Sequence, residues 1–253
     1  MPESIRELRN AWRPGDPHVV EALRDSEVTR SRLLYDSSNY VFLVDLAHPA
    51  HGAGLAVYKP QRGERPLGDF PYGTLHRREI AAWEYARLLG WEIVPPTLER
   101  EGPEGAGSFQ LFIEHNPAEH FFELRDRGEL REALIRVAAF DLLANNADRK
   151  GGHVLLDDSG QLWCIDNALC FHSYEKLRTV IWDFAGERLP EAWQHDIGRV
   201  RDCLRARDAS TDALRACLHE REVEALIERS TELLAHPVLP EMYPWRCVPW
   251  PPI

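Results

Sequence analysis

The chain has 253 residues, a formal net charge of -11 at pH 7 and 44% hydrophobic residues. This length and composition are typical of a folded globular protein with a substantial core. The negative charge argues against broad nucleic-acid binding, which needs a basic surface. Five cysteines without a CxxC pair indicate neither a disulfide framework nor a zinc cage. Because no apolar run is long enough for a membrane span and the start lacks a signal peptide, we expect a cytoplasmic protein without stable membrane association.

Strands are predicted first along the chain, where short runs of β-branched and aliphatic residues alternate with polar turns. A helix with a glycine C-cap at Gly90 follows these strands, and one more strand comes after a glycine-rich loop. The predicted strands are residues 28–34, 40–46, 53–58 and 108–114, and the predicted helix is residues 75–89.

The second half is predicted to be mainly helical. Residues 129–146 carry an apolar stripe at helical spacing, and residues 211–235 form the clearest later helix. A hairpin of residues 154–156 and 162–165 lies between them. The C-terminal tail is rich in proline and tryptophan, and we expect Trp245 and Trp250 to anchor it by packing.

This order predicts an α+β protein with two lobes and a cleft between them. The β-rich N-lobe is placed at residues 1–115 and the mainly helical C-lobe at residues 116–253, which together form one catalytic domain.

Lys59 ends a predicted strand and is one of only three lysines among 30 basic residues. A lysine retained against such an arginine bias is a candidate for a site that needs a compact ammonium group. The alternative is a solvated lysine at the end of a strand.

Glu79 lies on the apolar stripe of the helix at residues 75–89, since successive residues turn by about 100°. A buried carboxylate needs a partner, and Lys59 is the obvious one. Glu79 could instead lie at the rim of the stripe and pair with Arg78 or with solvent.

The segment from Asn145 to Leu156 reads NNADRKGGHVLL and connects the helix at residues 129–146 to the hairpin. Asp148 falls on its loop, and Asp166 ends the second hairpin strand. Two loop carboxylates that flank one hairpin can converge on a metal ion and a hydroxyl group, as phosphoryl transfer requires. Both aspartates could instead simply cap turns.

These segments resemble the type II phosphatidylinositol 4-kinase family, within the wider phosphatidylinositol 3-/4-kinase-like superfamily of atypical kinases. The blocks that carry the resemblance are AVYKP at 56–60, GSFQLFIE at 107–114, FDLLANNADR at 140–149 and IDNALCFH at 165–172. With the helix between them they span roughly residues 35 to 175.

The resemblance implies that Lys59 binds the ATP phosphates with Glu79 as its partner, that Asp148 is the catalytic aspartate and that Asp166 binds metal. A turn takes the place of the phosphate-covering loop, three residues form the hinge beside adenine, and three apolar side chains complete the nucleotide site. These further residues are Ser37, Ser38 and Asn39 for the turn, Phe112, Ile113 and Glu114 for the hinge, and Val57, Leu155 and Ile165.

The chain departs from the family pattern in two places. His153 stands where the family has an asparagine as second metal ligand, so Mg2+ is the expected cofactor with ATP but Mn2+ is possible. The cysteine-rich palmitoylation segment of the lipid kinases has no counterpart, so we do not expect phosphatidylinositol as the substrate.

The leading hypothesis is a kinase that transfers the γ-phosphate of ATP to a hydroxyl of a soluble polyol, inositol-like, or of a protein serine or threonine. Lys176 and Arg178, after Asp166, could hold an anionic acceptor or pair with neighbouring acids. One alternative is a nucleotide-binding pseudokinase that acts as a regulatory module, with His153 marking weakened metal chemistry. A third possibility is transfer of AMP instead of phosphate.

Overall fold

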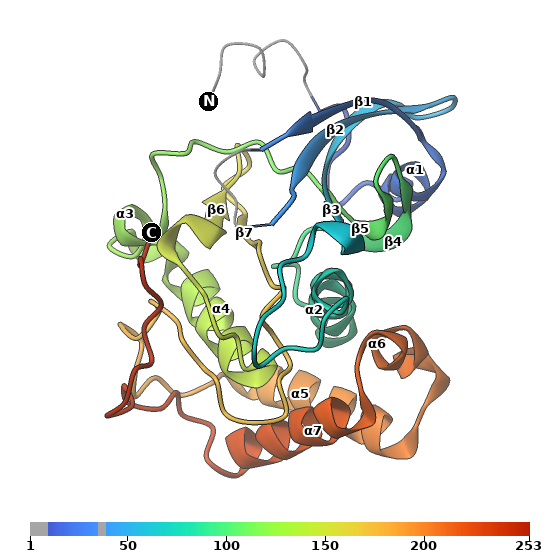
Figure 1. Cartoon of the computed structure of the whole chain (residues 1–253). Helices are drawn as coiled ribbons and strands as arrows, with labels where there is room; N and C mark the ends of the chain where they lie inside the picture. Colours follow the sequence, from blue (N-terminus) through green and yellow to red (C-terminus); the bar gives the residue numbers. More distant parts are fainter. Residues whose placement is uncertain (1–9, 35–38) are drawn as a thin grey trace. The chain divides into compact units, whose positions relative to one another are not determined.

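The first part of the chain is organised around a five-stranded antiparallel sheet (Figure 1). The computed structural model describes residues 10–34 and 39–253. The strands occur in the order β1-β2-β3-β5-β4. Their bounds are β1 Glu27–Leu33, β2 Phe42–His48, β3 Gly52–Pro60, β4 Thr97–Gly102 and β5 Gly105–Leu111.

The sheet confirms the three strands predicted before residue 60, with ends that differ by one to two residues. The strand predicted at 108–114 is β5, which instead begins at Gly105 and ends at Leu111. It starts earlier because Gly105, at φ 92°, makes the turn of a hairpin with β4. β4 was not predicted from the sequence, because charged residues occupy its exposed positions.

Two compact units divide the chain. The first, called the sheet unit here, contains the described residues up to Ile80 together with Pro95–Glu114, and the second, called the helical unit, contains Ala81–Val94 and His115–Ile253. Besides its strands, the sheet unit contains α1, Val19–Asp25, and the start of α2, Leu75–Leu89. The predicted helix at 75–89 is α2, and Gly90, at φ 75°, follows it as expected.

The helical unit contains α4, α5 and α7 and a two-stranded hairpin of β6 and β7. Helices α5 and α7 lie against each other, and α7 also contacts α4 (Figure 1). The bounds are α3 Phe121–Leu124, α4 Arg131–Ala144, β6 Val154–Leu156, β7 Leu162–Cys164, α5 Glu191–Ala206, α6 Asp212–Cys217 and α7 Glu220–Ala235.

The prediction of one helix at 211–235 is wrong, because these residues contain two helices, α6 and α7. Leu218 is extended, and His219 begins α7 with a capping box in which its N–H donates to Glu222 Oε2 at 2.9 Å. Local capping therefore outweighs the continuous apolar pattern at this point.

The C-terminal tail is held through its backbone. The carbonyl of Cys247 accepts hydrogen bonds from Thr179 N and Trp182 Nε1, and the carbonyl of Pro252 accepts one from Gly151 N at 2.7 Å. Trp250 is 79% exposed, so the prediction that it anchors the tail by packing is wrong, whereas Trp245 stacks on Tyr243 with ring centroids 4.7 Å apart.

Among the described residues, no helix combines the length and the apolar character that crossing a membrane would require.

Gly107 provides a test of the sheet. A Cβ at this position would lie 2.4 Å from the carbonyl oxygen of Lys59 on the neighbouring strand. We expect Gly107→Ala to lower the free energy of unfolding by about 1–3 kcal/mol, because backbone must move. Urea denaturation measures this, with Gly128→Ala as the control, since a Cβ there meets nothing within 4 Å. Equal stability of the two variants would contradict the strand pairing.

Candidate active site

The sheet unit brings Lys59 and Glu79 together. Lys59 lies near the end of β3, opposite Ser108 of β5, and its Nζ donates to Glu79 Oε1 of α2. The Glu79 side chain is 2% exposed and that of Lys59 is 20% exposed. The predicted pairing is therefore confirmed, and the helical periodicity correctly placed Glu79 on the inward side of α2.

The first turn of α2 is fixed by a second set of charges. The backbone N–H and ring Nδ1 of buried His76 bond Glu64 Oε1 at 2.9 and 2.8 Å, and its Nε2 lies 3.2 Å from Glu99 Oε1. Burial alone would raise the pKa of Glu64, but the hydrogen bonds from His76 and from the N–H of Leu75 outweigh it and lower that pKa. This anchor sets the start of the helix that carries Glu79.

The residues predicted to form the hinge follow β5 and are tied to the start of the described chain. Phe112 N donates to the carbonyl of Leu55 at 3.0 Å, while Asn10 Nδ2 donates to the carbonyl of Phe112 at 2.8 Å. Asn10 N also donates to Glu114 Oε1 at 2.8 Å, and Ile113 is buried. The sequence analysis did not single out Asn10, because a contact across some hundred residues leaves no local pattern.

Two more of the predicted residues are described in the sheet unit. Asn39 Oδ1 accepts a hydrogen bond from Arg65 N at 2.9 Å, and half-buried Val57 pairs with Gln110 of β5. Ser37 and Ser38 lie outside the described residues.

In the helical unit the predicted catalytic loop begins where α4 ends. Asn145 adopts a left-handed conformation, φ 52°, and closes the helix. Its Nδ2 donates to the carbonyls of His172 and Tyr174, and its Oδ1 accepts from Lys176 N at 2.8 Å. One buried amide therefore fixes both the end of α4 and the segment that follows Asp166.

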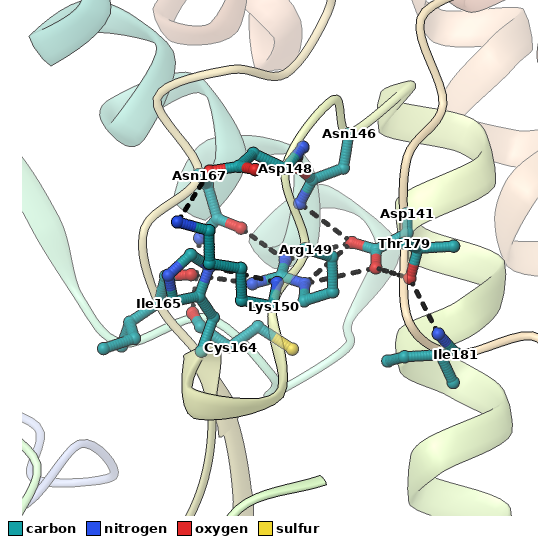
Figure 2. Close-up of polar contacts among 11 residues, drawn as sticks. Asp141, Asn146, Asp148, Arg149, Lys150, Cys164, Ile165, Asn167, Thr179 and Ile181 are labelled. Atoms are coloured by element: carbon teal, nitrogen blue, oxygen red, sulfur yellow. Dashed lines mark hydrogen bonds and ion pairs between the residues drawn. The ribbon is translucent and has the colours of Figure 1, made fainter. Parts of the chain in front are cut away.

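Arg149 is the centre of this loop and is fully buried (Figure 2). Its Nε donates to both carboxylate oxygens of Asp141 at 3.0 and 3.1 Å. Its Nη1 donates to the carbonyl of Ile165 at 2.7 Å and its Nη2 to Asn167 Oδ1 at 2.6 Å. This guanidinium belongs to the residue that follows Asp148. It thus links the loop of Asp148 to α4 and to the residues on either side of Asp166.

Asp141 is itself saturated with donors. Asn146 Nδ2 and Thr179 Oγ1 donate to it at 3.0 and 3.1 Å, in addition to Arg149. Burial alone would lower the pKa of Arg149, but the Asp141 carboxylate outweighs this and raises it. The guanidinium is therefore held in its charged form, and each of the groups in this buried pair has several hydrogen-bond partners.

Asp166 and His153 come together at the end of the hairpin. Asp166 follows β7 with φ 57°, and His153 Nε2 lies 3.3 Å from Asp166 Oδ2. The Lys150 N–H donates to His153 Nδ1 at 3.4 Å, which leaves Nε2 directed at the carboxylate. The Asp166 side chain is 45% exposed. An imidazole nitrogen and a carboxylate at this spacing fit a divalent metal, with manganese favoured over magnesium by the nitrogen donor.

The remaining predicted apolar residues lie on the same hairpin. Leu155 of β6 is buried, and Ile165 is partly buried between β7 and Asp166.

Asp148 lies on the loop beside these groups. Burial raises its pKa, with a further contribution from the negative charge of Asp166; Lys150, whose Nζ is 3.5 Å from Asp148 Oδ2, and Arg178 partly oppose the rise. A raised pKa is typical of a carboxylate that accepts a proton in catalysis.

Sequence reasoning missed the residues that hold this arrangement. Asp141 and Arg149 lie in the segment FDLLANNADR, but a charged residue next to a loop normally indicates the surface. A carboxylate inside the apolar run FDLLA was the available signal, because a charge on the buried stripe of a helix needs a partner. Asn167 and Thr179 had no such signal. The missed residues are Asn10, Asp141, Arg149, Asn167 and Thr179.

One curated protein is similar to the chain along nearly its whole length. The chain is 35% identical to Protein Rv2133c of Mycobacterium tuberculosis over an alignment 269 positions long, which covers 93% of this chain and 95% of that one. No protein-family model matches the chain.

Solved structures of kinase-like proteins are similar to the chain. Hydra Fam20 with sugar has a TM-score of 0.57 at 17% identity and covers 86% of each chain. The Golgi casein kinase with Mn/ADP bound has a TM-score of 0.56 at 14% identity, over 90% of this chain and 79% of that one. At such identities the likeness shows the fold alone, and the predicted α+β kinase-like fold is confirmed. The closer kinship with type II phosphatidylinositol 4-kinases stays a prediction.

Neutralising Asp141 tests the buried pair. We expect Asp141→Asn to destabilise the protein by about 3–5 kcal/mol, because it leaves the Arg149 guanidinium buried without a counter-charge. Urea denaturation measures the loss. The control is Asp158→Asn in the exposed turn of the hairpin, where the change should stay within about 0.5 kcal/mol. If both variants match the wild type, Arg149 is not held by Asp141's charge.

Replacing Asp148 by asparagine should stabilise the fold at pH 7. The folded pKa of Asp148 is raised, so the folded protein binds that proton more tightly than the unfolded chain, and its ionisation costs stability as pH rises through the folded pKa. Asp148→Asn removes this cost. The gain in thermal midpoint should shrink as pH falls through the raised pKa toward the ordinary value, and Asp158→Asn should show no such dependence. A destabilised Asp148→Asn protein at pH 7 would refute this assignment.

Proposed function

We propose that this chain, which belongs to the same family as Protein Rv2133c of Mycobacterium tuberculosis, is an ATP-dependent phosphotransferase with a hydroxyl group as acceptor. The observation that carries the proposal is the convergence of Asp148, His153 and Asp166 around one buried arginine in a kinase-like fold. The Lys59–Glu79 pair supports it independently, because a lysine held by a buried carboxylate is suited to binding phosphate oxygens.

In this proposal Lys59 binds ATP phosphates, and Glu79 keeps its side chain extended toward them. Asp148 orients the acceptor hydroxyl and takes its proton. The hydroxyl oxygen then bonds to the γ-phosphorus while the bond from that phosphorus to the bridging oxygen breaks, which leaves ADP. The raised pKa of Asp148 favours its role as proton acceptor.

Asp166 and His153 would hold the divalent metal. A bound metal ion neutralises negative charge on the phosphate oxygens as the reaction proceeds. The solved Golgi casein kinase is described with Mn/ADP bound, which supports manganese as a cofactor here, with magnesium as the alternative.

The acceptor belongs to one of two classes. The resemblance to type II phosphatidylinositol 4-kinases favours a soluble inositol-like polyol. The similarity to a structure named casein kinase favours a hydroxyl of a protein serine or threonine. Lys150, 3.5 Å from Asp148, and Arg178, whose charge acts on Asp148, suit an acceptor that carries negative charge near the reacting hydroxyl.

A pseudokinase is the second candidate function, and His153 is the observation that favours it. Its Nε2 faces Asp166, so this nitrogen must lose its proton before it can ligate a metal. In that case the chain would bind nucleotide and regulate a partner without turnover.

Metal-dependent ATP consumption tests the proposal. We expect turnover with Mn2+ or Mg2+ that falls at least about 100-fold in Asp148→Asn, Asp166→Ala and Lys59→Met, because each removes a group that acts on the reacting phosphate or hydroxyl. Asp158→Asn is the matched control and should keep wild-type turnover. Intact-mass analysis of the protein and of a polyol panel identifies the species that gains phosphate, or adenylate.

The outcomes separate the candidates. Turnover lost in the Asp166 variant supports the kinase. Nucleotide binding without turnover in the wild type, with turnover gained in His153→Asn, would support the pseudokinase instead. Turnover that is equal in wild type and all three variants would reject the assigned site.

A further inference from the structure

Three histidines and a glutamate gather in the sheet unit, where α1 meets the turn between β2 and β3. The rings of His48 and His51 stack with centroids 4.4 Å apart, and those of His18 and His51 with centroids 4.3 Å apart. Nε2 of His51 lies 3.7 Å from Glu21 Oε1. The proposed phosphotransferase site uses none of these side chains.

The turn that carries His51 is firmly placed. Gly52, at φ 74°, allows the tight reversal, and buried Trp12 donates its Nε1–H to the His51 carbonyl at 2.7 Å. The Trp12 ring also lies where a Cβ on Gly54 would be, so the hairpin and the indole are packed in direct contact. His51 is therefore presented by a backbone with little freedom.

The donor set fits a metal ion. One ligand atom from each of Glu21, His48 and His51 lies within 4.8 Å of the other two. Around one tetrahedral zinc ion, ligand atoms lie roughly 3.4 Å apart. The Glu21 side chain is 60% exposed and can move, and the stacked rings of His48 and His51 must also turn so that one nitrogen of each faces the same ion. Two imidazoles and one carboxylate form a typical zinc ligand set that leaves a fourth position for water, and imidazole disfavours magnesium and calcium.

We propose that Glu21, His48 and His51 form a binding site for one divalent transition-metal ion of the zinc type. The proposal is independent of the proposed phosphotransferase activity. The site lies wholly in the sheet unit, whereas His153 and Asp166 belong to the helical unit.

His48 must exchange hydrogen bonds to take part. Its Nδ1 accepts the N–H groups of Ala50 and His51, both at 3.2 Å, so the proton of a neutral ring is on Nε2. Ligation through Nε2 moves that proton to Nδ1, and ligation through Nδ1 uses the lone pair of that nitrogen, so either mode displaces the two amides. Both hydrogen bonds are long, and Ala50 is exposed, so water can replace a partner at little cost.

A metal here would link α1 to the sheet. Helix α1 has only seven residues, fewer than an isolated helix needs, and it is held by burial of Val19, Ala22 and Leu23. Arg100 of β4 also donates to the carbonyls of Leu23 and Ser26, and a bond from Glu21 through the metal to the β2–β3 turn would add to these contacts. The expected role is therefore structural stabilisation of the sheet unit.

Zinc titration by calorimetry, in excess Mg2+ and without nucleotide, tests the proposal. We expect one tight zinc ion per chain, bound at least about tenfold more weakly by His51→Gln and by Glu21→Gln. His153→Asn and His195→Gln, an exposed histidine on α5, should keep this ion. Co2+ should give the visible absorption of a tetrahedral site in the wild type and not in His51→Gln.

Thermal unfolding supplies a second readout. Zinc should raise the midpoint of the wild type and of His153→Asn by more than that of Glu21→Gln, whose exposed side chain can change without loss of the fold. Equal zinc affinity and equal thermal shifts in the wild type and Glu21→Gln would overturn the proposal. Loss of the ion in His153→Asn alone would assign the metal to the helical unit instead and would also overturn it.

Discussion

The buried ion pair of Arg149 and Asp141 is the interaction on which the helical unit's site depends. Both side chains are fully shielded from solvent, and a charge so placed cannot be left without its partner. The guanidinium uses its remaining donors on Ile165 and Asn167. Because Arg149 directly follows Asp148, the two loops that carry the candidate catalytic and metal-binding aspartates share one fixed point.

The same region holds groups in states that cost stability. Asp166 has a left-handed backbone, and the pKa of Asp148 is raised by burial and by the nearby carboxylate. Such strain persists where the surroundings fix the conformation, and it is typical of functional sites. The hydrogen bonds of Arg149 and Asn145 supply that fixation here. In the sheet unit, too, a buried carboxylate is fixed by a partner of opposite charge: Glu79 is paired with Lys59.

Much of the fold and part of the site could be predicted from the sequence. Periodicity placed Glu79 on the inward side of α2, and the strand and turn patterns located β1, β2, β3 and the β6–β7 hairpin. These features are local, so neighbouring residues record them. The role of Arg149 was missed because the partners of its guanidinium lie on two separate segments, α4 and residues 165–167.

Other features could not be predicted from the sequence. Either the residues that form them are far apart in the chain, or a local interaction outweighed the apolar pattern. The break between α6 and α7 follows from capping by His219, which outweighs a continuous apolar stripe. The cluster of Glu21, His48 and His51 joins a helix to a distant turn, and no spacing in the sequence indicates it. A tryptophan predicts burial on average, yet Trp250 is exposed, while the carbonyl groups of Cys247 and Pro252 accept hydrogen bonds that help to hold the tail.

The most direct test of the central role of Arg149 is metal-dependent ATP turnover of Arg149→Lys. Lysine keeps a charge for Asp141 but cannot also reach Ile165 and Asn167 in the same geometry. The account predicts a folded protein, by circular dichroism, whose turnover is at least about tenfold lower. Wild-type turnover in the folded variant would contradict it, because the loops of Asp148 and Asp166 would then keep their arrangement without the shared guanidinium.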